Sequence, residues 1–158
     1  MKEASVMNGN IESGKFDELL QLEEALKSDT FGEVKNPLLE SVKTHKGTMD
    51  DPLPWPHIEY SANVIKMEEA VYNFHKNNPD YGLKDYMDIL GQYGYTDIKV
   101  DTVDVSEMDD RCLMALFMAL IRGERFCDGL ILDALETGAV QRWLARLREV
   151  VYGKKTEE

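Results

Sequence analysis

The residues with the clearest chemical potential lie in the octapeptide RGERFCDG, residues 122–129. Arg122 and Arg125 carry guanidinium groups three positions apart, with Glu124 between them. A guanidinium presents a planar set of donors that suits a carboxylate or a phosphate. The octapeptide is therefore either an anion-binding pocket or a structural lock that pairs with the chain's own carbonyls and carboxylates. We favour the lock, because Asp128 stands at helical i,i+3 spacing from Arg125 and an acidic chain supplies further partners.

A second group of candidate binding residues lies on the proline-rich segment PLPWPHIEYS, residues 52–61. Trp55 and Tyr60 are carried there on a stiff, extended backbone. Their rings can stack on a ligand or cover the open end of the core. We favour the covering role, and keep both as tentative ligand-binding residues together with the charged residues of the octapeptide.

Sequence motifs for catalysis or cofactor binding are missing. The chain has no G-x-S-x-G, no glycine-rich phosphate loop, no H-E-x-x-H and no dinucleotide fingerprint. Its three histidines and two cysteines lack the spacing of a metal site. Cys112 and Cys127 lie in apolar stretches and are predicted to be buried, unreactive thiols. We therefore expect no catalytic residue, no metal and no cofactor.

The charge balance restricts the partners. Thirty acidic against eighteen basic side chains give a net charge of -12. This disfavours general nucleic-acid binding and adsorption to an anionic membrane. Six of the acids fall within residues 97–110. Those near the end of this strip are expected to stabilise the first turn of the next helix, whereas Asp97, Asp101 and Asp104 also allow imitation of a phosphate backbone.

The apolar pattern predicts the elements that must position these residues. The chain has 158 residues, 43% of them hydrophobic, which is enough for one core. The run Cys112–Ile121 is apolar on every face and too short to cross a bilayer. We predict an all-α, compact bundle of five to six helices around a buried central helix at about 107–122, capped by Ser106. One short strand or hairpin is expected in addition, with residues 98–105 as the candidate strand.

Helical spacing and stop signals divide the chain further. Helices are predicted at 16–31, 37–44, 62–77, 81–93, 107–122, 124–136 and 139–152. Arg142 and Arg146 are expected on the solvated face of the last helix. The organisation expected is a polar N-terminal tail (1–15), a helical extension and connector (16–52), a single helical domain (53–152) and a charged tail (153–158). The polar amino terminus lacks the apolar core of a signal peptide, so we expect a cytoplasmic location.

The central helix, RGERFCDG and the following ETGAVQRWLARL resemble an uncharacterised bacterial family of domains of unknown function, over residues 57–150. The family pattern joins a Tyr-Ser entry, an Arg-x-Glu/Asp-Arg-Phe-x-x-Gly motif and a closing helix. Its positions here are Tyr60, Ser61, Arg122, Glu124, Arg125, Phe126, Gly129, Gly138, Val140, Arg146 and Leu147.

The resemblance implies family membership but no activity. Similar domains also occur joined to macro domains that handle ADP-ribose, which implies at most an accessory role near that chemistry. This sequence shows no such companion domain. It also has Tyr81-Gly-Leu-Lys-Asp-Tyr where the family leads us to expect a Phe-Asp-Trp segment.

Three functional hypotheses follow. The first is a non-enzymatic, cytosolic helical module that interacts with another protein. The second is a binder of a phosphorylated small molecule, of nucleotide or ADP-ribose type, through Arg122 and Arg125. The third is an acidic nucleic-acid mimic that inhibits a DNA-binding enzyme. A homo-oligomer is compatible with the sequence, which does not specify the oligomeric state.

Overall fold

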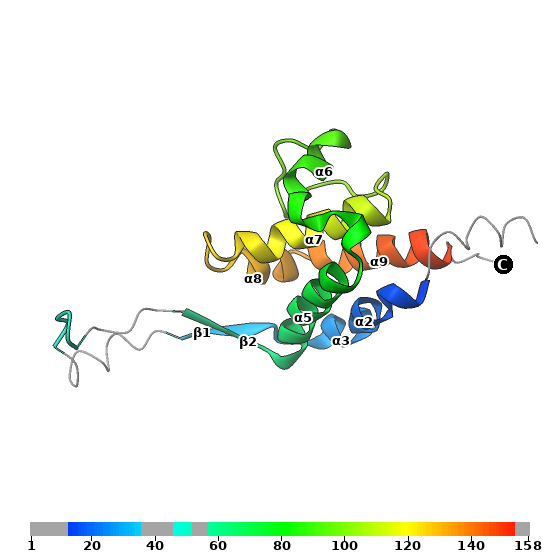
Figure 1. Ribbon diagram of the computed structural model, residues 1–158. Helices are drawn as coiled ribbons and strands as arrows, with labels where there is room; N and C mark the ends of the chain where they lie inside the picture. The colour runs from blue at the N-terminus through cyan, green and yellow to red at the C-terminus, as the bar shows by residue number, and fades with distance from the viewer. Residues whose placement is uncertain (1–12, 36–45, 52–56, 154–158) are drawn as a thin grey trace, which may run out of the picture.

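The computed structural model describes residues 13–35, 46–51 and 57–153 of the chain. The described part is mostly helical and carries one two-stranded antiparallel hairpin (Figure 1). The predicted bundle of helices with a short hairpin is therefore confirmed. The longer helices are α5 (Ala62–Asn77), α6 (Tyr86–Gln92), α7 (Asp110–Gly123), α8 (Leu130–Glu136) and α9 (Ala139–Tyr152).

Short elements complete the described chain. The N-terminal segment holds α2 (Asp17–Leu20) and α3 (Leu22–Ala25), flanked by 3-10 turns at Ser13–Phe16 and Leu26–Ser28. Two more 3-10 turns, Pro79–Tyr81 and Leu83–Asp85, precede α6. The hairpin pairs β1 (Gly32–Lys35) with β2 (His57–Tyr60), so that Gly32 lies opposite Tyr60.

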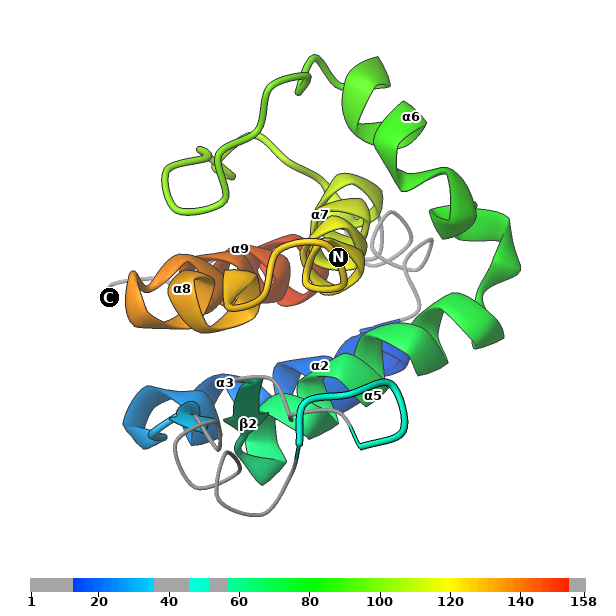
Figure 2. The ribbon, with the colours of Figure 1, turned by 90° about the vertical axis from the view of Figure 1, so that its left-hand side faces the viewer.

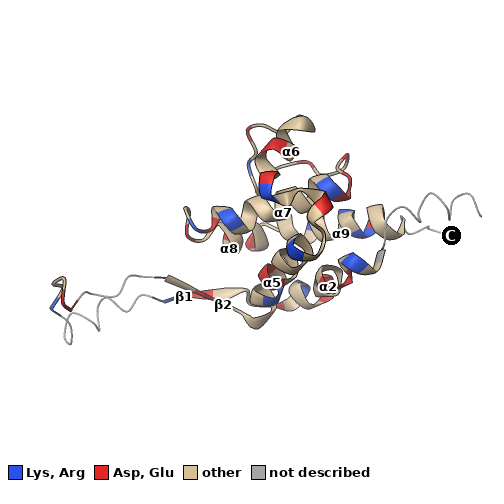
Figure 3. Ribbon diagram, in the orientation of Figure 1, with Lys and Arg blue, Asp and Glu red and all other residues tan. Residues whose placement is uncertain are grey.

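The centre of the molecule is α7, as the apolar run predicts. Figure 2 shows α8 and α9 beside α7, with α2, α3 and α5 in a second layer. Almost all of the α7 ribbon carries uncharged residues (Figure 3). Phe117 of α7 meets Trp143 of α9 edge to face, with 5.3 Å between ring centroids. Each large side chain buried here contributes about 1.5–3 kcal/mol to stability before entropy.

The start of α7 differs from the prediction. The helix begins at Asp110, and the cap is Asp109, whose carboxylate accepts a hydrogen bond from the Cys112 amide at 2.9 Å. The predicted cap at Ser106 is wrong because residues 105–108 form a turn that buries Met108 in the core. An aspartate at this position satisfies a free amide of the first helical turn.

The segment predicted as a strand, residues 98–105, forms turns instead. The amides of Thr102 and Val103 both donate to the Lys99 carbonyl. Those local bonds use backbone groups that a strand would need for a ladder. The alternation of apolar residues also breaks after Val100, which is the sequence signal of the turn.

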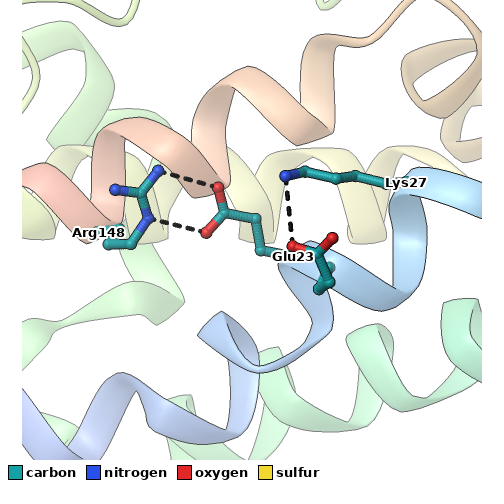
Figure 4. Close-up of polar contacts among 4 residues, drawn as sticks. Glu23, Lys27 and Arg148 are labelled. Carbon is teal, nitrogen blue, oxygen red and sulfur yellow. Dashed lines mark hydrogen bonds and ion pairs between the residues drawn. The ribbon is translucent and has the colours of Figure 1, made fainter.

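The N-terminal segment packs into the same core as α7. Phe16, Leu19, Leu22 and Leu26 are buried, and the ring of Phe16 stacks on Phe74 of α5 at 5.0 Å. The predicted helix over 16–31 is broken and ends at Ser28. Figure 4 shows the bidentate contact that joins this segment to α9, between the Glu23 carboxylate and the Arg148 guanidinium.

Two further predictions concern the region after the hairpin. The helix predicted over 62–77 is confirmed, and the Ser61 side chain caps it by accepting a hydrogen bond from the Val64 amide. The helix predicted over 81–93 is shorter and begins at Tyr86. Gly82 interrupts it with a φ of 66°, a left-handed conformation that glycine adopts at little cost.

The remaining predictions on organisation lie partly outside the described residues. The helix predicted over 37–44 and most of the connector before residue 57 fall there. The division of the chain into tail, extension, domain and tail stays a prediction.

Candidate functional site

The octapeptide forms the junction between α7 and α8, and we call residues 124–129 the junction turn. The prediction that a helix starts at Glu124 is wrong, because α8 begins at Leu130. Amides of Phe126 and Cys127 both donate to the Gly123 carbonyl, which closes a tight turn. Gly129 then takes a φ of 94°, a conformation that stops one helix before the next begins.

Glu124 holds the start of α8. One carboxylate oxygen, Oε1, accepts the Ile131 amide at 2.8 Å, and the other, Oε2, accepts the Gly129 amide at 3.0 Å. The first amides of a helix have no partner within the helix and carry partial positive charge. The anion that binds this helix start is therefore a carboxylate of the chain itself, so these amides are not available to an anionic ligand.

Tyr60 joins the hairpin to this lock. Its hydroxyl donates to Glu124 Oε2 at 2.9 Å and accepts the Leu132 amide at 3.3 Å. Burial and the adjacent Glu124 carboxylate raise the pKa of the Tyr60 hydroxyl far above its ordinary value, so it stays a donor. Ile58, two residues earlier on β2, lies 3.4 Å from the position a Cβ would take at Gly129.

These contacts decide the role of one of the two aromatic candidates, Tyr60. Tyr60 is a hydrogen-bonding anchor between β2 and α8. Trp55, the other predicted aromatic, lies outside the described residues.

The two arginines of the octapeptide are not held by carboxylates of the described chain. Arg125 is exposed, and its guanidinium donates to the Tyr72 hydroxyl at 3.3 Å instead of pairing with Asp128. Arg122 is partly buried, and its Nε finds no hydrogen-bond partner among the described residues. The octapeptide does contain a lock, but the locking residue is Glu124.

A cleft of about 410 Å³ lies between α5 and the end of α7, and we call it the α5–α7 groove. Its α5 side presents residues at i, i+3, i+4 and i+7, which share one face of a helix. Its other side is formed by the end of α7 and the first residues of the junction turn. The lining residues are Ile65, Glu68, Glu69 and Tyr72 from α5, Ile121 from α7, and Glu124 and Arg125 from the junction turn.

The groove combines apolar surface with negative charge. Ile121 is buried at its base, and Ile65 is 45% exposed. Burial, together with the carboxylates of Glu124 and Glu69, raises the pKa of Glu68 above its ordinary value. Two like charges near a half-buried carboxylate favour an incoming cation over an incoming anion.

The α5 side of this groove was not predicted from the sequence. Another face of α5, which carries Val64, Met67 and Val71, is buried in the core. The signal was nevertheless present, since Ile65 and Tyr72 stand seven residues apart on the opposite stripe with two glutamates between them.

The junction turn carries exposed side chains next to the groove. Phe126 is 89% exposed. The prediction that Cys127 is buried is wrong, because the turn places it at the surface as a free thiol. The other thiol, Cys112, is buried as predicted, and burial raises its pKa to about 12.

Two arginines of α9 contact the loop that precedes α7. Arg142 donates to the Asp101 carbonyl at 2.9 Å, and Arg146 donates to the Met108 carbonyl at 3.0 Å. Arg142 is exposed, as the predicted solvated face requires, whereas Arg146 is partly buried, so the prediction is wrong at Arg146. Both contacts fasten the 96–109 loop to α9.

The acidic strip divides as predicted at Asp109 and Asp110 but not at Glu107, which is exposed in the turn before α7. Asp109 caps α7, and Asp110, at its first position, accepts the Tyr81 hydroxyl at 2.5 Å. Asp97, Asp101 and Asp104 are exposed. Among residues 13–35, 46–51 and 57–153, no three His, Cys, Asp or Glu side chains gather as a metal site would require.

The fold and the groove define a helical domain with a surface cleft. The Glu124 carboxylate fixes the junction between α7 and α8 next to this cleft. The chain belongs to DUF6508, a family of unknown function whose model matches residues 18–153. The match begins well before residue 57, where the resemblance starts, and so includes α3 and the hairpin. No curated protein and no solved structure matches the chain. In the described ranges, no helix has both the length and the hydropathy needed to span a bilayer.

Proposed function

We propose that this protein is a non-enzymatic interaction module that binds another protein through the α5–α7 groove and the junction turn. The observation that carries the proposal is Phe126, which is 89% exposed on a turn that hydrogen bonds close and that contributes Glu124 and Arg125 to the groove. Aromatic and arginine side chains are enriched at the centres of protein interfaces. Phe126 and Arg125 supply one side chain of each type. The hydrogen bonds of the turn restrict the backbone that carries them.

The two cysteines support the cytoplasm as the place of action. Both are free thiols in the structure, and Cys127 is exposed. Exposed free thiols are characteristic of proteins kept in a reducing compartment. We further propose the pattern from Arg122 to Gly129 as the sequence signature of the family, since Glu124 and Gly129 form the junction lock together.

Site-specific photo-crosslinking tests the proposal. A photoreactive phenylalanine analogue replaces Phe126 in the full chain, and the control carries it at Met87, which is 61% exposed on α6. We expect a protein adduct at position 126 and none at position 87. The captured protein, once purified, should bind the unmodified chain and lose about tenfold in affinity when Phe126→Ser is introduced. Absence of an adduct at position 126, or equal capture at both positions, contradicts the proposal.

One observation favours a second candidate, a site for a phosphorylated small molecule at Arg122. The Nε atom of Arg122 is buried without a partner in the described chain, and a phosphate oxygen would satisfy it. The glutamates that share the groove with Arg125 oppose an anion there. Thermal-shift measurements with ADP-ribose and ADP test this candidate. Stabilisation of the unmodified protein that is lost in Arg122→Lys supports it, and the absence of any shift rejects it.

A further inference from the structure

We infer that the α5–α7 groove receives a lysine or arginine side chain from a basic segment of the partner protein. The inference rests on the proposed function, because it names the chemistry of the partner that binds there. Three properties of the groove support it: its apolar walls, its uncompensated carboxylates and the way Arg125 is already engaged.

The walls of the groove suit the aliphatic part of a long basic side chain. Ile65 and the Tyr72 ring stand on the α5 side, and Ile121 closes the base. Lysine and arginine bury their methylene stems along apolar surface while the charged end stays at the rim. A short acidic or neutral polar side chain gains nothing from such walls.

The rim supplies the negative charge that the basic end group needs. Glu68 and Glu69 make no hydrogen bond or ion pair with the described part of the chain. The oxygens of Glu124, the third carboxylate, already accept hydrogen bonds from amides at the start of α8 and from the Tyr60 hydroxyl. Two adjacent carboxylates therefore remain for a partner's cation.

Arg125 also lines the groove, but it pairs with neither Glu68 nor Glu69. Its guanidinium donates to the Tyr72 hydroxyl, and no ion pair joins it to Glu68 or Glu69. The chain's own cation is thus held at one side of the groove by a neutral acceptor. The net charge of -12 adds a long-range attraction for basic segments and raises the rate of encounter.

Peptide titration of the full chain, followed by nitrogen-15 amide spectra, tests the inference. The probe is the capped peptide acetyl-GALKALRG-amide, and the control peptide has glutamine in place of its lysine and arginine. We expect the basic peptide to shift amides of the groove residues, the shift to weaken with added salt, and the neutral peptide to shift none of them.

Variants of the chain separate the groove from general charge. Glu68→Gln combined with Glu69→Gln should weaken binding of the basic peptide about fivefold or more. The matched control is Asp97→Asn combined with Glu107→Gln, two exposed acids outside this groove, which should change the affinity less than about twofold. Equal effects of the two double variants, or shifts spread over the whole surface, overturn the inference. Amide spectra of both variants verify that each is folded.

The two proposals fail in different ways. If crosslinking at position 126 captures a partner whose affinity is unchanged by Glu68→Gln and Glu69→Gln, the basic side chain is rejected and the interaction module stands. If the basic peptide binds in the groove but position 126 captures nothing, the groove preference stands and the proposed docking through the junction turn is rejected.

Discussion

The arginines of α9 and those of the octapeptide 122–129 show two uses of the same side chain. Arg142 and Arg146 each reach a backbone carbonyl of the 96–109 loop, and Arg148 binds both oxygens of Glu23. Arg122 and Arg125 contact no carboxylate of the described chain. The arginines of α9 therefore join distant parts of the fold, as Arg111 of α7 also does through the Tyr81 carbonyl, whereas those of the octapeptide pair with no acid of the described chain.

The difference follows from what faces each arginine. The loop beside α9 has carbonyls that no strand or helix uses, and an arginine fork satisfies them. At the junction, the groups in need of partners are amides at the start of α8, which call for an acceptor. Glu124 supplies that acceptor, so a carboxylate locks this region and the neighbouring guanidiniums do not.

The largest effect is expected for Glu124→Ala. The substitution leaves the Gly129 and Ile131 amides and the Tyr60 hydroxyl without their acceptor, and the loss of unfolding free energy should be about 3 kcal/mol. Urea denaturation measures it. Glu136→Ala, an exposed glutamate at the other end of α8, is the control and should cost less than about 0.5 kcal/mol. Equal losses for the two variants would contradict the assignment of the lock.

A double-mutant cycle on Glu23 and Arg148 measures what an arginine of α9 contributes. The pair is bidentate and its side chains are 16% and 34% exposed, so a coupling of about 1 kcal/mol is expected after screening by solvent. The control cycle uses Glu24 and Lys27, an exposed ion pair of the same N-terminal segment, whose side chains are 86% and 57% exposed. Its coupling should be about 0.3 kcal/mol or less. A control coupling as large as that of the bidentate pair would show that geometry and burial do not matter here.

Arg125→Ala should leave stability nearly unchanged. The side chain is exposed and makes one hydrogen bond, to Tyr72, so the expected loss is below about 0.5 kcal/mol. Thermal and urea unfolding of Arg125→Ala and of Arg148→Ala measure the loss of unfolding free energy in each region and so compare the two directly. A loss above about 2 kcal/mol would restore the interpretation of Arg125 as a structural lock.

The smallest effect is a gain, expected for Glu68→Gln. Burial and neighbouring carboxylates raise the pKa of Glu68 in the folded protein, so the folded state binds its proton more tightly than the unfolded state. Stability from this group is present at acid pH and is lost as pH rises through the folded pKa. Glu68→Gln should therefore raise the melting temperature at about pH 7 and give no gain at about pH 3.5. Glu136→Gln, whose carboxyl is exposed, serves as the control, and a gain for Glu68→Gln at both pH values would argue against the charge as its cause.

Periodicity was enough to place the core of the molecule. The run from Cys112 to Ile121 predicted the central helix, and the Trp143 stripe predicted the buried face of α9, because burial of a whole face follows from spacing along one helix. The helix after Ser61 was predictable for the same reason, together with its local cap. Both kinds of signal are contained in a few adjacent residues.

The groove and its lock depend on residues far apart along the chain. Glu124 meets Tyr60 across 64 positions, and Arg125 meets Tyr72 across 53. The packing of the hairpin, α5 and the junction turn determines which carboxylate caps α8. The same packing determines which arginines make no ion pair. Local spacing suggested an ion pair between Arg125 and Asp128, yet three-dimensional packing placed the Glu124 carboxylate at the start of α8. Pairing the free amides there with a carboxylate stabilises the fold more than an exposed ion pair would.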